Sequence, residues 1–208
     1  IRLRVERPIV LKFKDNDKVI KYNVTTEDIL STLQILCENS IYTYQGQIAE
    51  GFITVKGGHR VGISGSCAIE NGKVINIKYI YSLNFRIARQ VIGSSNPVLR
   101  HILNLESNSI YNTLIVSAPG TGKTTILRDI IRQLATGIKE IKFLAINVGV
   151  VDERGEIAAM YKGIPQNDIG IKTDIMENVS KNIGIRMLIR SMAPKVIVAD
   201  EIGKREDI

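Results

Sequence analysis

Hydrophobic and polar residues alternate along the start of the chain, which predicts short strands. Residues 1–24 follow a two-residue period that is interrupted at Pro8 and at the polar triplet Asp15-Asn16-Asp17. This pattern indicates strands joined by a hairpin. Residues 29–37 instead carry apolar side chains at helical spacing, directly after a helix-start pattern of two threonines and two acidic residues. We expect this helix to bury one stripe against the sheet.

Extended segments continue after a second predicted helix near residues 41–49. They cover residues 51–58, 59–70 and 73–89, and the dipeptide Asn71-Gly72 predicts a tight hairpin between the last two. The small residues Gly62, Ser64 and Ser66 share one face of a strand. Such a face permits close approach of another backbone, and we favour plain sheet packing as its explanation. The first part of the chain is therefore predicted to be an α+β domain.

The pattern changes after the sequence GSSNP, residues 93–97. Glycine, serine and proline there indicate a linker, assigned to 93–100, with Pro97 opening a helix. Apolar runs at 112–118, 143–153 and 195–201 follow, separated by helical segments, and the last two end in acidic residues. Such runs are typical of buried strands in a parallel sheet. The fold class is therefore α/β, with an α+β domain at 1–92 and a core with a mainly parallel sheet at 101–208.

Composition narrows the class of protein. The formal net charge of +7 would suit binding to nucleic acid, to an acidic membrane surface or to an acidic protein. It is equally consistent with cationic residues dispersed over the surface without a partner. The chain has no run of five basic residues that would favour one of these explanations. Two cysteines and two histidines argue against a disulfide framework or a histidine-rich zinc site. The apolar runs fall far short of a membrane-spanning helix, and residues 1–10 lack the apolar core of a signal peptide. We predict a cytoplasmic protein, and contact with a membrane-embedded partner stays open.

The sequence SAPGTGKTT has the form of a phosphate-binding loop. It follows a predicted strand and precedes a helical segment, which is the context that such a loop requires. Gly120 and Gly122 let backbone amides point at the phosphates of ATP, Lys123 would neutralise them, and Thr124 would coordinate Mg²⁺. A glycine usually opens this loop; serine is tolerable at that position if its backbone conformation is ordinary. The predicted ATP-binding residues are Ser117, Ala118, Pro119, Gly120, Thr121, Gly122, Lys123, Thr124 and Thr125.

Carboxylates end two of the predicted strands. Asp200 would hold the magnesium together with Thr124, and Glu201 would act as general base on the attacking water. Carboxyl ends of parallel strands open on one edge, so the acidic segment Asp152–Glu156 should face the same crevice, with Glu153 orienting water or the waters around the metal. The alternative for Asp200 and Glu201 is a polar turn, and the alternative for residues 152–156 is a solvated loop.

Six segments carry a specific resemblance. They are residues 57–65, 82–90, 112–134, 148–158, 163–174 and 187–203. Together they resemble the stage III sporulation AA family of ATPases from endospore-forming bacteria and, more distantly, the type II and type IV secretion and pilus ATPases. The resemblance implies a RecA-like P-loop core in a hexameric ring. It also implies an ATP-hydrolysing motor or assembly ATPase for a secretion-like channel between mother cell and forespore, acting from the mother-cell cytoplasm on membrane proteins of that channel.

The resemblance also points to arginines. Secretion ATPases bring arginines from the N-terminal domain to the nucleotide, which implies catalytic roles for Arg86 and Arg89 and a weaker candidacy for Arg60. On a strand, Arg86 and Arg89 would face opposite sides, so we expect one of them to reach the phosphates. Arg186 and Arg190 share a helix face and match an arginine-bearing helix in those ATPases, or form a salt-bridging surface. The family's histidine box has no counterpart by Ile208, so we expect a core that is incomplete at its C-terminus.

Two other functions compete with this reading. The net charge would also suit a RecA-like motor that moves nucleic acid, yet aromatic residues are only 5% of the chain and form no stacking cluster interleaved with lysines. A nucleotide-dependent oligomeric scaffold with little turnover is the other alternative. Glu201 argues against it, because a protein that only binds ATP needs no positioned base.

Overall fold

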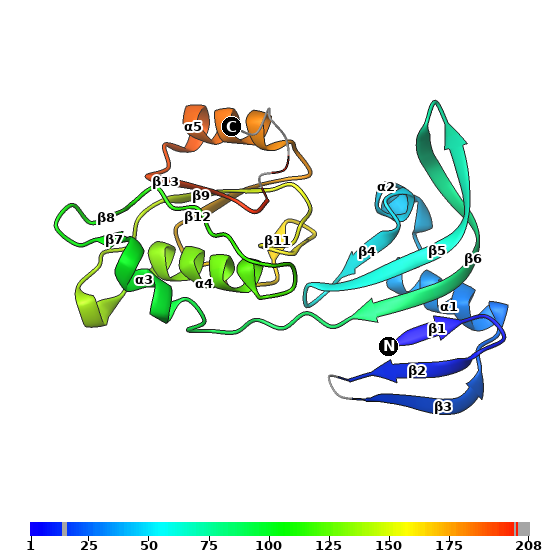
Figure 1. Cartoon of the computed structure of the whole chain (residues 1–208). Coiled ribbons are helices and arrows are strands. Elements are labelled where there is room, and N and C mark those ends of the chain that lie inside the picture. The colour runs from blue at the N-terminus through cyan, green and yellow to red at the C-terminus, as the bar shows by residue number, and fades with distance from the viewer. Residues whose placement is uncertain (14–15, 202, 204–208) are drawn as a thin grey trace. The chain divides into compact units, whose positions relative to one another are not determined.

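The computed structural model describes residues 1–13, 16–201 and 203 (Figure 1). The chain forms two compact units, Ile1–Ala88 and Arg89–Ile208. Residues 93–100, the predicted linker, form a turn and most of α3 (Asn96–Ile102) in the second unit. Asp15 of the predicted hairpin turn lies outside the described residues. In the part of the chain that is described, no helix combines the length and apolar character needed to cross a membrane.

The first unit is an antiparallel sheet of six strands with short helices. Its strands are β1 (Arg2–Arg4), β2 (Pro8–Lys12), β3 (Asp17–Asn23), β4 (Phe52–Val55), β5 (His59–Glu70) and β6 (Lys73–Arg86). They lie in the order β3-β2-β1-β6-β5-β4. The helices are α1 (Thr26–Leu36), η1 (Ile41–Tyr44) and α2 (Gln45–Ala49). The predicted hairpins and both predicted helices are therefore present.

Helix α1 begins as its sequence indicates. Thr25 accepts a hydrogen bond from the Asp28 amide at 3.1 Å, and the Asp28 carboxylate accepts one from the Thr25 amide at 2.8 Å. This reciprocal pair satisfies two amides that the helix itself leaves open. Ile29 and Leu33 are then buried in the core of the first unit.

Pairing with β6 accounts for the small residues of β5. The Ser64 and Ser82 hydroxyl oxygens lie 2.7 Å apart across the two strands. A Cβ atom on Gly65 would lie only 2.7 Å from the Lys78 carbonyl oxygen, so a larger residue would force the strands apart. Gly65 lies at the irregularity of the β5–β6 pairing between Ser64 and Ser66, so these close contacts are made within the sheet.

The second unit is built on a parallel sheet. Strands β12 (Thr173–Glu177) and β13 (Val196–Ala199) both pair in parallel with β9 (Val148–Asp152), which lies between them. The remaining elements are β7 (Leu103–Asn104), β8 (Ser109–Ile110), α4 (Lys123–Thr136), η2 (Lys139–Ile141), β10 (Met160–Tyr161), β11 (Ile164–Pro165) and α5 (Lys181–Met192). The predicted α/β class with a parallel sheet is confirmed.

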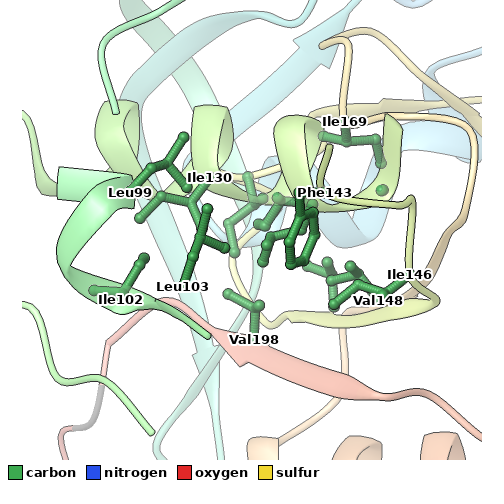
Figure 2. Packing of buried hydrophobic residues seen from close by; sticks show 14 of the residues in the cluster. Leu99, Ile102, Leu103, Ile130, Phe143, Ile146, Val148, Ile169 and Val198 are labelled. Carbon is green, nitrogen blue, oxygen red and sulfur yellow. The ribbon is translucent and has the colours of Figure 1, made fainter. Parts of the chain in front are cut away.

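Helices cover both faces of this sheet. Figure 2 shows the cluster that joins α4 to the sheet, in which Ile130 of α4 packs with Val148 of β9 and Val198 of β13. On the other face, Gly184 of α5 lies against Val151, because a Cβ atom there would be 2.8 Å from the valine Cγ1. Successive strand residues point to opposite faces, so α4 and α5 cover opposite sides of β9. Every residue of β9 is buried.

One predicted strand differs from the structure. Residues 112–118 form no strand within the described ranges, and the side chains of Leu114 and Val116 are 71% and 80% exposed. Ile115 packs against the core next to α4. The prediction of a buried strand is therefore wrong for this structure, because β9 is the only described strand that pairs with β13 and residues 112–118 pair with none. An apolar run reveals a tendency to be buried, but it does not reveal whether a partner strand lies beside it.

Candidate nucleotide-binding site

The phosphate loop owes its shape to two glycines in left-handed conformations. Gly120 has φ +76° and Gly122 has φ +97°, a region that residues with a Cβ atom seldom adopt. Helix α4 starts immediately afterwards at Lys123, with Gly122 as its N-cap residue. Because glycine has no side chain to cap the helix, the first amides of α4 are left for another acceptor. The loop and the helix start together form an anion-binding geometry.

Ser117 is accommodated without strain. Its backbone is not in the left-handed region, so the expectation for this position agrees with the geometry. The Ser117 and Thr121 hydroxyl oxygens lie 2.6 Å apart, and Thr121 also donates to the Ala118 carbonyl at 2.8 Å. The serine therefore connects the two sides of the loop, which a glycine could not do.

Lys123 folds back over the loop. Its ammonium group donates to the carbonyl oxygens of Ser117 at 2.9 Å and Ala118 at 3.1 Å. The cation thus lies across the loop opening, close to the amides that begin α4.

The two predicted metal ligands meet. The Thr124 hydroxyl donates to the Asp200 carboxylate at 3.3 Å, which brings the start of α4 to the end of β13. Burial raises the pKa of Asp200, the charge of Glu156 raises it further, and the Thr124 hydrogen bond opposes the shift. Additional negative charge comes from Asp152 and Glu201. A hydroxyl and a carboxylate with further carboxylates nearby are an oxygen donor set that fits Mg²⁺.

The acidic segment forms a loop around Asp152. This carboxylate is only 1% exposed and accepts hydrogen bonds from the amides of Glu156 at 2.7 Å, Ile157 at 3.1 Å and Ala158 at 2.9 Å. Asp152 therefore shapes the loop from inside. Glu153 forms an ion pair with Lys181 at the start of α5. Its carboxylate is thus engaged with a lysine in this structure.

Glu201 is likewise engaged. Its carboxylate lies 2.8 Å from the Arg154 guanidinium, and both side chains are largely exposed. This ion pair connects the acidic loop to the segment after β13. It brings the candidate base to the same edge of the sheet as Asp200, where the sequence predicts it.

The candidate arginines occupy different settings. Arg86 is the last residue of β6 and lies opposite Arg60, whose guanidinium stacks on the Phe52 ring at 4.2 Å from the centroid. Arg89 begins the second unit, and because β6 ends at Arg86 the expected strand alternation does not extend to it. Two further arginines are exposed on α5 and form no ion pair with any described residue. These are Arg186 and Arg190.

Sequence reasoning missed two neighbouring residues of α4. Arg128 donates to the carbonyl oxygens of Ile157 at 3.0 Å and Glu156 at 2.8 Å. Asp129 is 1% exposed and accepts from the amides of Gly93 at 3.1 Å and Ser95 at 2.9 Å. A charged pair directly before the buried residues Ile130 and Ile131 was the available signal, because charge at a buried helical position requires partners.

Comparisons with known proteins found a matching family and similar sequences. The family model described as "Sporulation stage III, protein AA" matches residues 1–208. "Stage III sporulation protein AA" of Bacillus subtilis (strain 168) is 42% identical over 207 residues, which cover 100% of this chain and 66% of the relative. "Uncharacterized protein ycf45" of Cyanidium caldarium is 33% identical over 127 residues, covering 60% of this chain and 34% of that protein.

A solved structure shares the fold. The Legionella pneumophila ATPase DotB superposes with a TM-score of 0.57 at 14% identity, covering 99% of this chain and 56% of the DotB chain. At that identity the likeness concerns the fold alone. The chain spans just under two thirds of the B. subtilis relative and about half of DotB.

Proposed function

Because the chain belongs to the stage III sporulation protein AA family, we propose that it provides the nucleotide site of an ATP-hydrolysing motor or assembly ATPase used in sporulation. The full-length protein would act in a hexameric ring on membrane proteins of a channel between mother cell and forespore, from the mother-cell cytoplasm. The single observation that carries the proposal is the meeting of Thr124 and Asp200 at the end of a glycine-shaped loop.

Phosphate binding would begin with an exchange of partners by Lys123. Its ammonium leaves the carbonyl oxygens of Ser117 and Ala118 and turns to the β- and γ-phosphates of ATP. The open amides at the start of α4 donate to the same phosphates. The ammonium therefore exchanges neutral carbonyl acceptors for anionic phosphate oxygens, to which its hydrogen bonds are stronger.

Thr124 and Asp200 would hold Mg²⁺, which supplies positive charge against the β- and γ-phosphates. The cation would stabilise the ionised form of Asp200, which burial and neighbouring carboxylates disfavour. Glu201 would polarise the attacking water as general base once its carboxylate separates from Arg154. Glu153 would orient that water from the neighbouring loop. Either Arg86 or Arg89 would meet the charge that develops on the γ-phosphate.

Two substitutions test the proposal in the intact protein. Lys123→Ala should abolish binding of a fluorescent ATP analogue, whereas Glu201→Gln should retain binding and lose turnover by at least about 100-fold. Lys139→Ala, at an exposed lysine of η2, is the matched control and should leave both unchanged. Chelation of Mg²⁺ should stop turnover in every active variant.

Different outcomes would favour the alternatives. Equal and negligible turnover in the wild type and in Glu201→Gln would favour a nucleotide-dependent scaffold. Stimulation by single-stranded DNA, absent with the membrane partners, would favour a nucleic-acid motor. Strong hydrolysis by Glu201→Gln would refute the assignment of this glutamate as base.

A further inference from the structure

We propose that Arg128 is a positioning residue that fixes the acidic loop, residues 152–158, to the helix that carries Lys123 and Thr124. The inference rests on the proposed function, because the purpose of the positioning is to present the acidic side chains to bound ATP. Arg128 itself is held by carbonyl groups of the loop and acts through it.

Helical geometry places Arg128 beside the site. It follows Thr124 by four residues in α4, so both side chains lie on one face of the helix. Its Nε donates to the Ile157 carbonyl at 3.0 Å and its Nη2 to the Glu156 carbonyl at 2.8 Å. Two parallel donors on a rigid plane fix the orientation of the loop as well as its distance, which a lysine ammonium cannot do.

The same stretch of loop is held from its other side. Asp152 accepts hydrogen bonds from the amides of Glu156, Ile157 and Ala158. Carbonyl groups of Glu156 and Ile157 therefore bond to Arg128 while their amides bond to Asp152. Asn167 adds a donor to the Ile157 carbonyl at 2.7 Å. Arg128 thus adds a directional, hydrogen-bonded connection from α4 to a loop whose Ile157 also packs in one hydrophobic cluster with Ile130 of that helix.

The positive charge of Arg128 also acts on the neighbouring carboxylates. Burial lowers the pKa of its guanidinium, and the charges of Asp152, Asp200 and Glu156 oppose that shift. The guanidinium is thus a fixed cation among three carboxylates that would otherwise repel one another. Its removal should let the loop move away from α4 and should misplace the acidic side chains relative to the phosphates.

The test uses three variants of the intact protein. Arg128→Met removes the donors and the charge, and Arg128→Lys keeps the charge but loses the two-point contact. Arg100→Met is the control, because Arg100 is an exposed arginine of α3 whose side chain contacts His101 rather than the acidic loop. Each variant is compared by hydrogen exchange of the amides of residues 156–158, by affinity for a fluorescent ATP analogue, and by turnover.

Both Arg128 variants should exchange these amides at least about tenfold faster, while α4 keeps its protection. Turnover should fall at least about tenfold with nucleotide affinity changed by less than about threefold, since the reacting groups are misplaced rather than removed. Arg100→Met should leave exchange at 156–158 as in the wild type. Exchange that is unchanged in both Arg128 variants, or full turnover in Arg128→Lys, would overturn the inference.

The exchange measurement also separates this inference from the proposed function. A wild type that binds ATP without turnover would refute the proposed function, while exchange would still report whether Arg128 holds the loop. If Arg128→Met fails to fold, Arg128→Lys decides the question, because it retains the cation in the cluster.

Discussion

Substitution of the buried Asp129 should destabilise the second unit, because this carboxylate connects several of its segments. Its carboxylate accepts hydrogen bonds from the Ser95 amide and hydroxyl at 2.9 and 2.7 Å, from the Gly93 amide at 3.1 Å, and from Arg132. Gln133 donates to it at 3.1 Å. Asp129→Asn keeps the shape of the side chain but removes the charge and turns an acceptor into a donor that faces other donors.

The expected cost follows from burial. Residue 129 is 1% exposed and the Arg132 side chain is 17% exposed, so little solvent can replace the lost partner. Breaking a buried ion pair by changing one member costs about 3–5 kcal/mol, and the retained shape and remaining acceptor of asparagine place the expected loss near about 3 kcal/mol. That loss corresponds to an unfolding equilibrium about 100-fold more favourable to the unfolded state.

The loss should depend on pH. Burial would raise the pKa of Asp129, but hydrogen bonds from Ser95, Arg132 and Gly93 outweigh burial and hold the pKa well below its ordinary value. A carboxylate with a depressed pKa stabilises the folded state fully above its unfolded pKa of about 3.9, and this contribution is lost as the pH falls below that value. The wild type and Asp129→Asn should therefore differ most near neutral pH and converge in acid.

Native-state hydrogen exchange of the α4 amides measures this difference, because those amides exchange when the second unit unfolds. Exchange in Asp129→Asn should be about 100-fold faster at pH 7. Glu140→Gln, an exposed carboxylate in η2, is the control and should match the wild type. An effect of less than about threefold, or a difference that stays constant from neutral to acid pH, would refute the role of the buried network.

Two further predictions concern glycine and the phosphate loop. Gly184→Ala should destabilise the second unit by about 1–3 kcal/mol, because the new Cβ atom would lie 2.8 Å from Val151 Cγ1 and force α5 away from β9. Urea unfolding measures this loss, and unchanged stability would contradict the packing of α5 on β9. Ser117→Gly should change affinity for a fluorescent ATP analogue by less than about tenfold, since it removes only the hydroxyl contacts with Thr121 and the Ala118 carbonyl. Gly122→Ala should weaken binding more, because φ +97° is strained for alanine, and an equal response of the two variants would count against this account of the loop.

Much of the fold followed from local patterns. The spacing of glycines in residues 117–125 reveals their conformational requirement, and Gly120 and Gly122 do adopt positive φ. Apolar runs that end in acidic residues predicted the parallel strands β9 and β13, because a strand buried on both faces has no polar alternation. These features depend on the residues themselves and on their nearest neighbours in sequence.

The remaining features depend on contacts between distant segments. Residues 112–118 have the composition of a buried strand, yet their pairing depends on a neighbour that no local pattern specifies. The ion pair between Arg154 and Glu201 joins residues far apart in sequence, and so does the contact of Arg128 with the acidic loop. The sequence predicted a role for Glu201 but none for Arg128, because the partner of each charge is set by the fold.

Helix α4 has a mechanical consequence for the whole second unit. It spans 14 residues, which is about 21 Å, and a helix of this length is a continuous hydrogen-bonded rod. Arg128 and Asp129 attach the acidic loop and residues 93–95 to this rod at adjacent positions, little more than one turn from Thr124. In the function proposed above, a shift of this helix at Lys123 and Thr124 would therefore act on both the acidic loop and residues 93–95, because both segments bond to the same helix.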